Sequence, residues 1–192
     1  MRPVCLKQIH GNRVISVDDE YGDDRRGGDG MVTATPGVAL CIFTADCVPV
    51  LLLDPVNRVV GALHAGWRGT LAAIAAVGVR SMIELGARAA SIEAALGPAI
   101  GSCCFEVDAE LAERFAREVP AAEYLARPGR TGKAYLDLRA IVRNQLEEAG
   151  LSAGHITTVG PCTKCANDRF FSRRAGGGAI SGLQMSFIGF PA

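Results

Sequence analysis

Three short motifs in this chain combine histidine, cysteine and acidic residues at predicted breaks between secondary-structure elements. The first contains His10, the second contains Asp46 and Cys47, and the third begins at His64. Imidazole and thiolate groups are zinc ligands, and a site with three of them leaves a fourth position open for water or substrate. His10, Cys47 and His64 therefore predict a catalytic zinc site if the fold brings these distant residues together.

The same residues allow other interpretations. His10 precedes a glycine and could be an exposed turn residue, and Cys47 could be an inert part of the core. Alternatively, Cys47 could be a nucleophile with His64 as its base and Asp46 as the orienting group. Neighbouring residues on an extended strand point to opposite faces, which counts against pairing Asp46 with Cys47 in this way. In a zinc site, Asp46 could instead orient a ligand or accept a proton.

The third motif adds a candidate anion site. Trp67 and Arg68 follow His64 where a predicted strand meets a long predicted helix, and glycines flank the pair. Helix N-termini attract anions, and the planar guanidinium group suits phosphate. Arg68 is therefore a candidate phosphate ligand, although Trp67 could simply pack and Arg68 could be solvated.

The remaining cysteines are harder to interpret. The chain has seven cysteines, an odd number, and no export signal at its start, which favours thiols or metal ligands over a disulfide framework. Cys162-x-x-Cys165 could be a redox pair or half a zinc site. Cys103 and Cys104 lie in a tight loop over residues 97–107 that could line a pocket. Because the two cysteines are adjacent, their geometry is poor for binding one metal ion together. We therefore expect these four cysteines to be structural thiols.

Several residues in the C-terminal part of the chain are expected to have structural or surface roles. Phe170 and Phe171 are expected in the core, and Arg173 and Arg174 are expected to be solvated or to bind an anion. His155 begins an apolar segment and is expected to be structural or on the surface rather than a metal ligand.

The elements that must position these residues form no regular series. Strands are predicted over residues 13–17, 38–44, 48–54, 58–64, 92–96, 155–159 and 184–190. Helices are predicted over residues 67–85, 108–119 and 137–149. The polar, glycine-rich segment 18–30 is expected to be a mobile surface loop. This order favours an α+β fold, with mixed β-sheets covered by helices, over a regular series of βαβ units.

Composition excludes several classes of protein. With 192 residues, of which 49% are hydrophobic, the chain is long enough for one compact domain and too apolar to be disordered. Its 20 Lys and Arg balance its 20 Asp and Glu, so no overall basic field attracts nucleic acid or a membrane surface. No apolar run approaches the length of a membrane helix, and no signal peptide is visible. These features predict a soluble, cytoplasmic protein, and its three histidines are too few for an oxidase with many histidine ligands.

The motifs QIHGNRV, TADCVPVLL, HAGWRGT, GPAIGSCCFEV and CTKC…FFSRR, in this order, resemble the YfiH-like family. That family is described both as polyphenol oxidoreductases with a laccase domain and as purine nucleoside phosphorylases. The resemblance implies a layered α/β sandwich. It also implies that His10, Cys47 and His64 are metal ligands, for zinc usually and for copper in some descriptions.

The resemblance further implies a set of reactions. They are phosphorolysis of adenosine, inosine, guanosine and methylthioadenosine, together with deamination of adenosine, so that the partners are a purine nucleoside and phosphate. In such a reaction we expect Arg68 to hold phosphate and Asp46 to act as the acid or base. A copper-dependent polyphenol oxidoreductase, a cysteine hydrolase using Cys47 and His64, and a non-catalytic module stabilised by metal stay open as alternatives. The oligomeric state also stays open.

One departure from the family concerns the start of the chain. Family members usually carry a longer, glycine-rich segment before the motif that contains His10, whereas this sequence begins close to that motif. We therefore expect a single catalytic domain over residues 1–192 that lacks the family's N-terminal segment. The departure bears on the completeness of the pocket and does not involve the three expected metal ligands.

Overall fold

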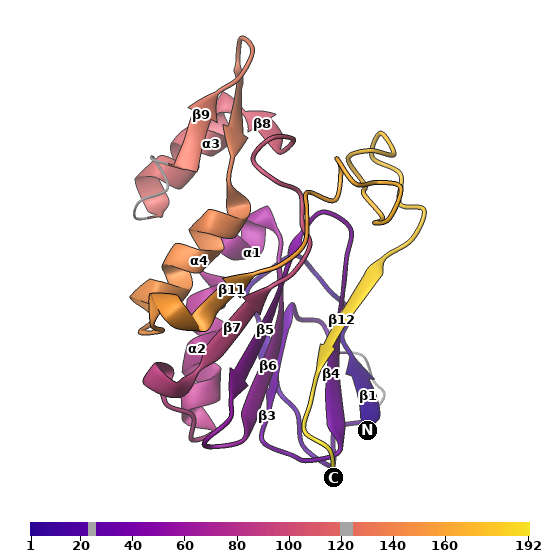
Figure 1. Ribbon diagram of the computed structural model, residues 1–192, viewed down its shortest axis with the longest axis vertical. Coiled ribbons are helices and arrows are strands. Elements are labelled where there is room, and N and C mark those ends of the chain that lie inside the picture. The colour runs from indigo at the N-terminus through magenta and orange to yellow at the C-terminus, as the bar shows by residue number, and fades with distance from the viewer. Residues whose placement is uncertain (23–25, 120–124) are drawn as a thin grey trace.

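The fold has three layers. The structure is a computed structural model that describes residues 1–22, 26–119 and 125–192. Helices cover one face of a six-stranded sheet, and a three-stranded sheet packs on the other face (Figure 1). A second three-stranded sheet projects at one end of the molecule together with helix α3 (Figure 1). The predicted α+β fold with mixed sheets is confirmed.

The central sheet has the strand order β11-β7-β5-β6-β3-β2. Its strands are β2 (Val14–Ser16), β3 (Gly30–Thr33), β5 (Val48–Asp54), β6 (Val59–Ala65), β7 (Glu93–Leu96) and β11 (Ile156–Thr158). The four inner strands pair antiparallel, whereas β2 and β11 pair parallel with their neighbours at the two edges. Every residue of β6 is buried, because one face of the strand packs towards the helices and the other towards the second sheet.

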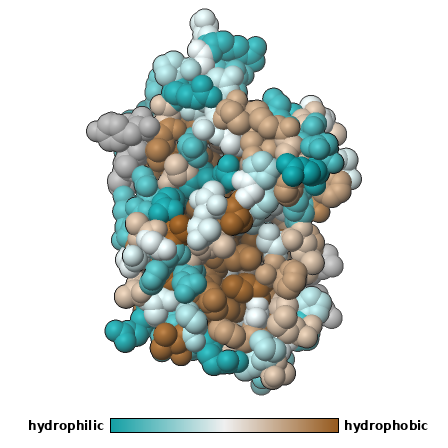
Figure 2. Space-filling model, in the orientation of Figure 1, coloured by the Kyte–Doolittle hydropathy of each residue, from teal (hydrophilic) through white to brown (hydrophobic). Residues whose placement is uncertain are grey.

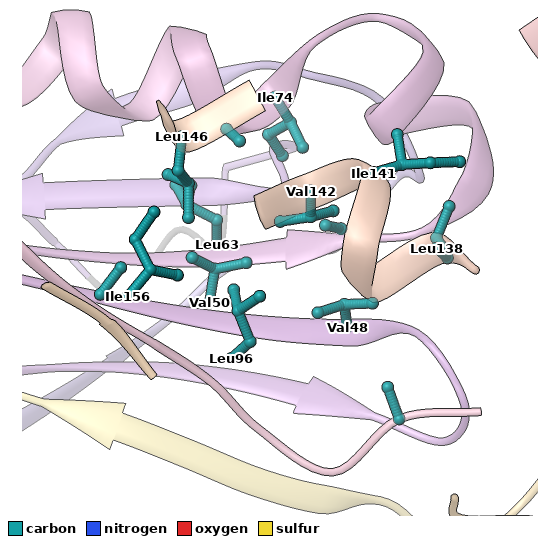
Figure 3. Packing of buried hydrophobic residues seen from close by; sticks show 14 of the residues in the cluster. Val48, Val50, Leu63, Ile74, Leu96, Leu138, Ile141, Val142, Leu146 and Ile156 are labelled. Atoms are coloured by element: carbon teal, nitrogen blue, oxygen red, sulfur yellow. The ribbon is translucent and has the colours of Figure 1, made fainter. Parts of the chain in front are cut away.

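Three helices enclose the larger core. They are α1 (Trp67–Leu71), α2 (Ile74–Glu84) and α4 (Leu138–Glu148), and short 3-10 turns precede β7 (η1, Ala89–Ser91) and β11 (η3, Ala153–His155). Val142 and Leu146 of α4 pack in one cluster with Val50, Leu63 and Leu96 of the sheet (Figure 3). Each fully buried side chain of this kind contributes roughly 1.5–3 kcal/mol to folding, so α4 is held mainly by its apolar face.

The helix predicted over residues 67–85 is in fact two helices. Ala73 has φ 56° and ψ 43°, a left-handed conformation that ends one helical segment and starts the next. The side chain of Asn12 donates a hydrogen bond to the carbonyl of Ala72 at this break, with a length of 2.8 Å. The break therefore ties the segment that follows His10 to the helical layer.

The second sheet is made of β1 (Arg2–Cys5), β4 (Val38–Thr44) and β12 (Gln184–Ile188). β1 runs parallel to β4 and β12 runs antiparallel to it, so both chain ends lie beside the start of β4 (Figure 1). Leu40 and Ile42 of β4 pack against Val60 and Ala62 of β6 between the two sheets. β1 was not predicted, because its four residues are too few to show a period.

The projecting sheet carries the helix predicted near residue 108. It contains β8 (Glu106–Asp108), β9 (Ala126–Pro128) and β10 (Lys133–Leu136), in the order β8-β10-β9, and α3 (Ala109–Glu118) packs against it. The helix agrees with the prediction, but β8, β9 and β10 were not predicted because each is too short to show a period.

Two further predictions from the sequence are wrong. Segment 18–30 is not simply a surface loop: Tyr21 and Asp29 are buried, and Gly30 begins β3. Residues 23–25 of this segment lie outside the described residues. Phe171 is not in the core, since 45% of it is exposed, and Phe170 is only half-buried. His155 is exposed at the end of η3, as expected.

The surface is divided between polar and apolar areas. Polar side chains gather at the end formed by the projecting sheet, and apolar side chains gather in the middle of the face in Figure 2. Among the large apolar residues on the surface, Met185 and Phe187 of β12 are more than half exposed. None of the helices within the described residues is long and apolar enough to cross a membrane.

Candidate metal centre

The fold brings His10, Cys47 and His64 together. The two ring nitrogens and the sulfur that they offer lie within 4.8 Å of one another. Cys47 lies in the turn between β4 and β5, and His64 lies near the end of β6, where the antiparallel register pairs it with Pro49. The two imidazole rings meet edge to face, with centroids 4.9 Å apart. Hairpin pairing of β5 with β6 therefore explains two of the three positions.

Asp29 holds the third position in place. This buried carboxylate accepts hydrogen bonds from the amides of Ile9, His10 and Gly11, at 3.2, 2.9 and 2.7 Å. Its other partner is Nδ1 of His64, at 2.8 Å, and the amide of His64 donates to the Asp29 carbonyl. The loop at His10, where φ is 60°, is thus fastened to β6 through one side chain.

The same carboxylate leaves one ring nitrogen of His64 open to a metal. Because Nδ1 of His64 is committed to Asp29, only Nε2 of that ring is left for a ligand. A carboxylate behind a metal-binding histidine fixes the ring and its tautomer and raises its basicity. The donor set of two imidazoles and one thiolate, with this carboxylate behind it, fits a zinc or copper ion.

These contacts shift the pKa values of Cys47, His64 and Asp29. Burial would raise the pKa of the Cys47 thiol, but hydrogen bonds and charge from His10 and His64 lower this pKa to about 7. Burial would lower the pKa of His64, but hydrogen bonds with Asp29 and Cys47 raise this pKa to about 9. Burial would also raise the pKa of Asp29, and hydrogen bonds from His64, Gly11 and His10 lower it instead. A thiolate ligand is therefore available near neutral pH, and a metal must displace a proton from His64.

Gly66 makes the room that the three ligands need. A Cβ at this position would lie 3.2 Å from the sulfur of Cys47, 3.5 Å from a ring carbon of His10 and 3.7 Å from a ring carbon of His64. Its φ of −77° and ψ of 169° suit any residue. The sequence therefore needs glycine here for space and not for backbone conformation.

A cavity of about 770 Å³ is lined by two of the three candidate ligands, His10 and Cys47. Its polar lining includes the side chains of Arg68, Arg173 and Arg174, and its aromatic lining includes Trp67 and Phe105. The guanidinium of Arg68 stacks 4.3 Å from the ring centre of Trp67. This cation-rich lining suits an anionic ligand. Helix α1 has only five residues, so the arginines rather than a helix dipole supply the positive charge.

Asp46 also lines this cavity, at the turn before Cys47. Its φ is 88°, and both carboxylate oxygens accept hydrogen bonds, from the hydroxyl of Thr163 and the amide of Arg174, each at 2.7 Å. Asp46 is the single acidic residue in the described lining of the cavity. The carboxylate that orients His64, however, is Asp29 and not Asp46.

A smaller cavity of about 300 Å³ lies beside the ligands. All three candidate ligands line it, and its walls are mostly apolar, with Phe43, Ile180 and Leu183 among the lining residues and Arg173 at its border with the larger cavity. His10 and Cys47 thus line both a cationic cavity and a mostly apolar one, an arrangement that suits a ligand with a charged part and an apolar part.

Sequence reasoning missed Asp29 and the convergence of Arg173 and Arg174 on the site. The one local signal for Asp29 is its place directly before β3, an acidic residue at the entry of an apolar strand. The arginines carry no such signal, because their position depends on the path of the chain after Cys165.

Comparisons with known proteins find relatives that match most of this chain. A purine nucleoside phosphorylase from Deinococcus radiodurans is 41% identical over 186 residues, which span 97% of this chain and 69% of that protein. Adenosine deaminase RL5, from an unknown prokaryotic organism, is 38% identical over 180 residues, which span 89% of this chain and 69% of that protein.

Solved structures agree as well. The crystal structure of YlmD from Geobacillus stearothermophilus matches with a TM-score of 0.91 at 34% identity, covering 100% of this chain and 74% of that one. The crystal structure of the Bacillus licheniformis protein YfiH matches with a TM-score of 0.91 at 37% identity, covering 98% of this chain and 74% of that one. The family model described as multi-copper polyphenol oxidoreductase laccase matches residues 1–191. On these grounds the chain belongs to that family, in which the YfiH and YlmD structures are its neighbours.

Proposed function

We propose that this protein is a zinc-dependent purine nucleoside phosphorylase, with His10, Cys47 and His64 as its metal ligands. The observation that carries the proposal is that these three residues meet, and that two of them, His10 and Cys47, line a cavity that three arginines also line. The names of several relatives, purine nucleoside phosphorylase among them, support the same reaction class.

The metal would supply one part of the chemistry. A zinc ion on these ligands would polarise a substrate oxygen or activate water. Asp29 would keep the ring of His64 turned towards the metal, and Gly66 would leave the space in which the ligands meet. Copper is the alternative ion, because imidazole and thiolate also bind copper.

The arginines would place the phosphate. Arg68, Arg173 and Arg174 would hold its oxygens with charge-assisted hydrogen bonds beside the anomeric carbon of the ribose. In phosphorolysis a phosphate oxygen forms a bond to that carbon while the bond from the carbon to the purine nitrogen breaks. The electron pair of the broken bond goes to the base, which takes up a proton.

Asp46 is our candidate for moving that proton. Its carboxylate is the acidic group within the described lining of the cavity, and it lies next to Cys47. The hydrogen bonds from Thr163 and Arg174 hold the carboxylate in one orientation at the wall of the cavity.

Deamination of adenosine is a second candidate activity. The name of the relative RL5 favours it, and an activated water beside a carboxylate is what attack on the amine-bearing ring carbon needs. Deamination would use the metal ligands and Asp46 but would not need phosphate or the arginines.

The decisive assay measures hypoxanthine released from inosine with and without phosphate, together with the metal content of the same sample. We expect release that requires both phosphate and zinc. Arg68→Ala should raise the KM for phosphate about tenfold or more, because it removes a charged contact worth roughly 1.5–3 kcal/mol. Arg80→Ala is the matched control, since Arg80 is an exposed arginine that lines a different cavity.

Other outcomes would assign other functions. Cys47→Ala should lose both metal and turnover; metal retained with activity lost would favour Cys47 as a nucleophile. Phosphate-independent release of ammonia from adenosine would favour deamination alone. Oxidation of a phenol by the copper-loaded protein, with no action on nucleosides, would favour the oxidoreductase in the family's description.

A further inference from the structure

We infer that Cys103, Cys104, Cys162 and Cys165 form a second metal site, in which four thiolates hold one structural zinc ion. The four sulfur atoms lie within 4.8 Å of one another. The site is separate from the candidate metal centre, because it shares no residue with it and contains no histidine. The inference goes beyond the proposed function and does not depend on it.

The spacing of the sulfurs fits a single tetrahedral ion. The sulfur of Cys165 lies 3.6 Å from that of Cys103 and 3.4 Å from that of Cys104. Four ligands at 2.3 Å around zinc place their sulfurs about 3.8 Å apart, whereas a disulfide needs about 2.05 Å. Cys165 is almost equally close to two partners, so a four-ligand site fits better than any one disulfide between them.

A tight turn explains how two adjacent cysteines can serve one ion. The amides of Cys104 and Phe105 both donate to the carbonyl of Gly101, at 2.9 Å. In such a turn neighbouring side chains do not point to opposite sides, as they would on a strand. The objection to Cys103 and Cys104 as joint ligands therefore does not hold for this backbone.

The second half of the site is the Cys162-x-x-Cys165 turn, which lies directly against the first. Ala99 and Cys162 form a parallel β-bridge, and the amide of Thr163 donates to the carbonyl of Ala99. A Cβ at Gly101 would lie 3.2 Å from Cβ of Cys162 and 3.3 Å from the sulfur of Cys103. Glycine at position 101 is thus what allows the two turns to come this close.

The surroundings offset the charge of such a site. Four thiolates and one Zn²⁺ carry a net charge of −2. The adjoining cavity of about 340 Å³ is lined by Arg130, Lys164 and Arg174 against a single described acid, Glu106, which pairs with Arg130. The amides of Gly101 and Cys165 also donate hydrogen bonds to the sulfur of Cys162. Cationic side chains and sulfur-directed amides stabilise thiolates.

The position of the cluster gives it a structural role. Four protein ligands leave no open position for substrate, which is typical of structural zinc. The two turns that it joins both contact Asp46, since the amide of Ile100 donates to the Asp46 carbonyl and Thr163 donates to its carboxylate. The second metal would therefore hold the turn beside Cys47 in place.

Counting metal ions in matched variants tests the inference. The protein is loaded with zinc, and loosely bound metal is removed. We then expect inductively coupled plasma mass spectrometry to find two zinc ions per wild-type chain. The double variant Cys103→Ser/Cys165→Ser should hold one ion, and so should His10→Ala, whose remaining ion is the one in the cluster. Cys5→Ser, a half-buried cysteine on β1, is the control and should hold two. A double variant with as much zinc as the wild type would overturn the inference, as would a His10→Ala variant without zinc.

A measurement on the wild-type chain covers the case in which the double variant does not fold. Cys103 and Cys165 are exposed, so an alkylating reagent should modify them quickly after chelation and at least tenfold more slowly with zinc bound. Equal rates in both conditions, or a disulfide between any two of the four cysteines in the native protein, would refute a zinc site. If the wild-type protein binds the cluster zinc but does not catalyse nucleoside phosphorolysis, the proposed function fails and the second metal site stands.

Discussion

At the scale of single residues, the candidate metal centre depends on a side chain that binds no metal. Asp29 is completely buried and accepts four hydrogen bonds, one from His64 and three from the loop that carries His10. A buried carboxylate is stable only when such donors surround it. Asp29 thus connects two ligands that come from different parts of the sequence.

Asp29→Asn should weaken zinc binding by about 10–100-fold, the usual effect of removing a carboxylate behind a metal-binding histidine. The asparagine amide would also place N–H groups against the backbone donors of His10 and Gly11. Competition with a chelating dye measures the affinity, and circular dichroism checks the fold. Asp19→Asn changes an exposed acid and is the control. Equal zinc affinity in the two variants would contradict this role for Asp29.

Gly66→Ala should also reduce metal affinity, for a reason of space alone. The added methyl group would press on the sulfur of Cys47 from 3.2 Å, while the backbone at residue 66 accepts alanine without strain. We expect a folded protein with about tenfold weaker zinc binding, consistent with a penalty of roughly 1–3 kcal/mol for overpacking. Gly22→Ala adds a methyl group that meets no atom within 4 Å, and it should bind zinc as the wild type does. Unchanged affinity for Gly66→Ala would show that the ligands can move apart freely.

At the scale of elements, the hairpin of β5 and β6 sets the distance between Cys47 and His64, and Asp54 secures the far end of that hairpin. Its buried carboxylate accepts hydrogen bonds from the amides of Val56 and Asn57 in the turn, and from the amide of Arg88 and the hydroxyl of Ser91 beyond it. The turn and the segment before β7 are therefore held by one side chain.

Asp54→Asn should lower the free energy of unfolding by about 1–3 kcal/mol at pH 7, since buried donors lose their acceptor. Burial would raise the pKa of Asp54, but hydrogen bonds from Asn57, Arg88 and Ser91 hold this pKa well below its ordinary value of 3.8. A lowered pKa stabilises the fold above the pKa of the unfolded chain, and this contribution is lost as the pH falls through the folded pKa. The difference between wild type and variant should therefore shrink below about pH 4.

Urea unfolding at pH 7, 5, 4 and 3 checks this prediction, with Asp19→Asn as a control that should follow the wild type at each pH. A difference between wild type and Asp54→Asn that stays constant over this range would mean that the Asp54 charge does not contribute to stability.

At the scale of the whole molecule, the candidate metal centre joins separate parts of the chain. His10 follows β1 of the second sheet, His64 belongs to the central sheet, and Arg174 reaches the cavity from the C-terminal segment. Both termini lie at the other end of β4, beside Val38, while Cys47 follows the end of this strand at Thr44 (Figure 1). A ligand that binds only when these parts are assembled stabilises the whole fold.

Zinc should therefore raise the melting temperature. At a free zinc concentration 100 times the Kd, binding contributes about 2.7 kcal/mol, which corresponds to about 5–10 °C for a chain of this size. Because the cysteine cluster would also bind zinc, the shift for the wild type minus the shift for His10→Ala gives the part that belongs to the candidate metal centre. Scanning calorimetry with and without zinc measures both shifts, and identical shifts in the two proteins would contradict a zinc ion at His10.

The sequence by itself determined the strands and helices with strong local patterns, and it pointed to His10, Cys47 and His64 as candidate metal ligands. The apolar runs at β4, β5 and β6 are long enough to show burial, and the helices at α3 and α4 have clear periods. His10, Cys47 and His64 could be chosen from composition and motif because imidazoles are few and each adjoins a break.

Only the tertiary structure decided which groups support those ligands. Asp29 looks like part of a polar loop until β3 pairs with β6, and Cys103 and Cys104 look unsuited as joint ligands until a turn places them against Cys162. The physical reason is the same in each case. Helices and strands follow from contacts between residues a few positions apart. These sites are made by hydrogen bonds and close approaches between segments far apart in the chain, so no local sequence pattern predicts them.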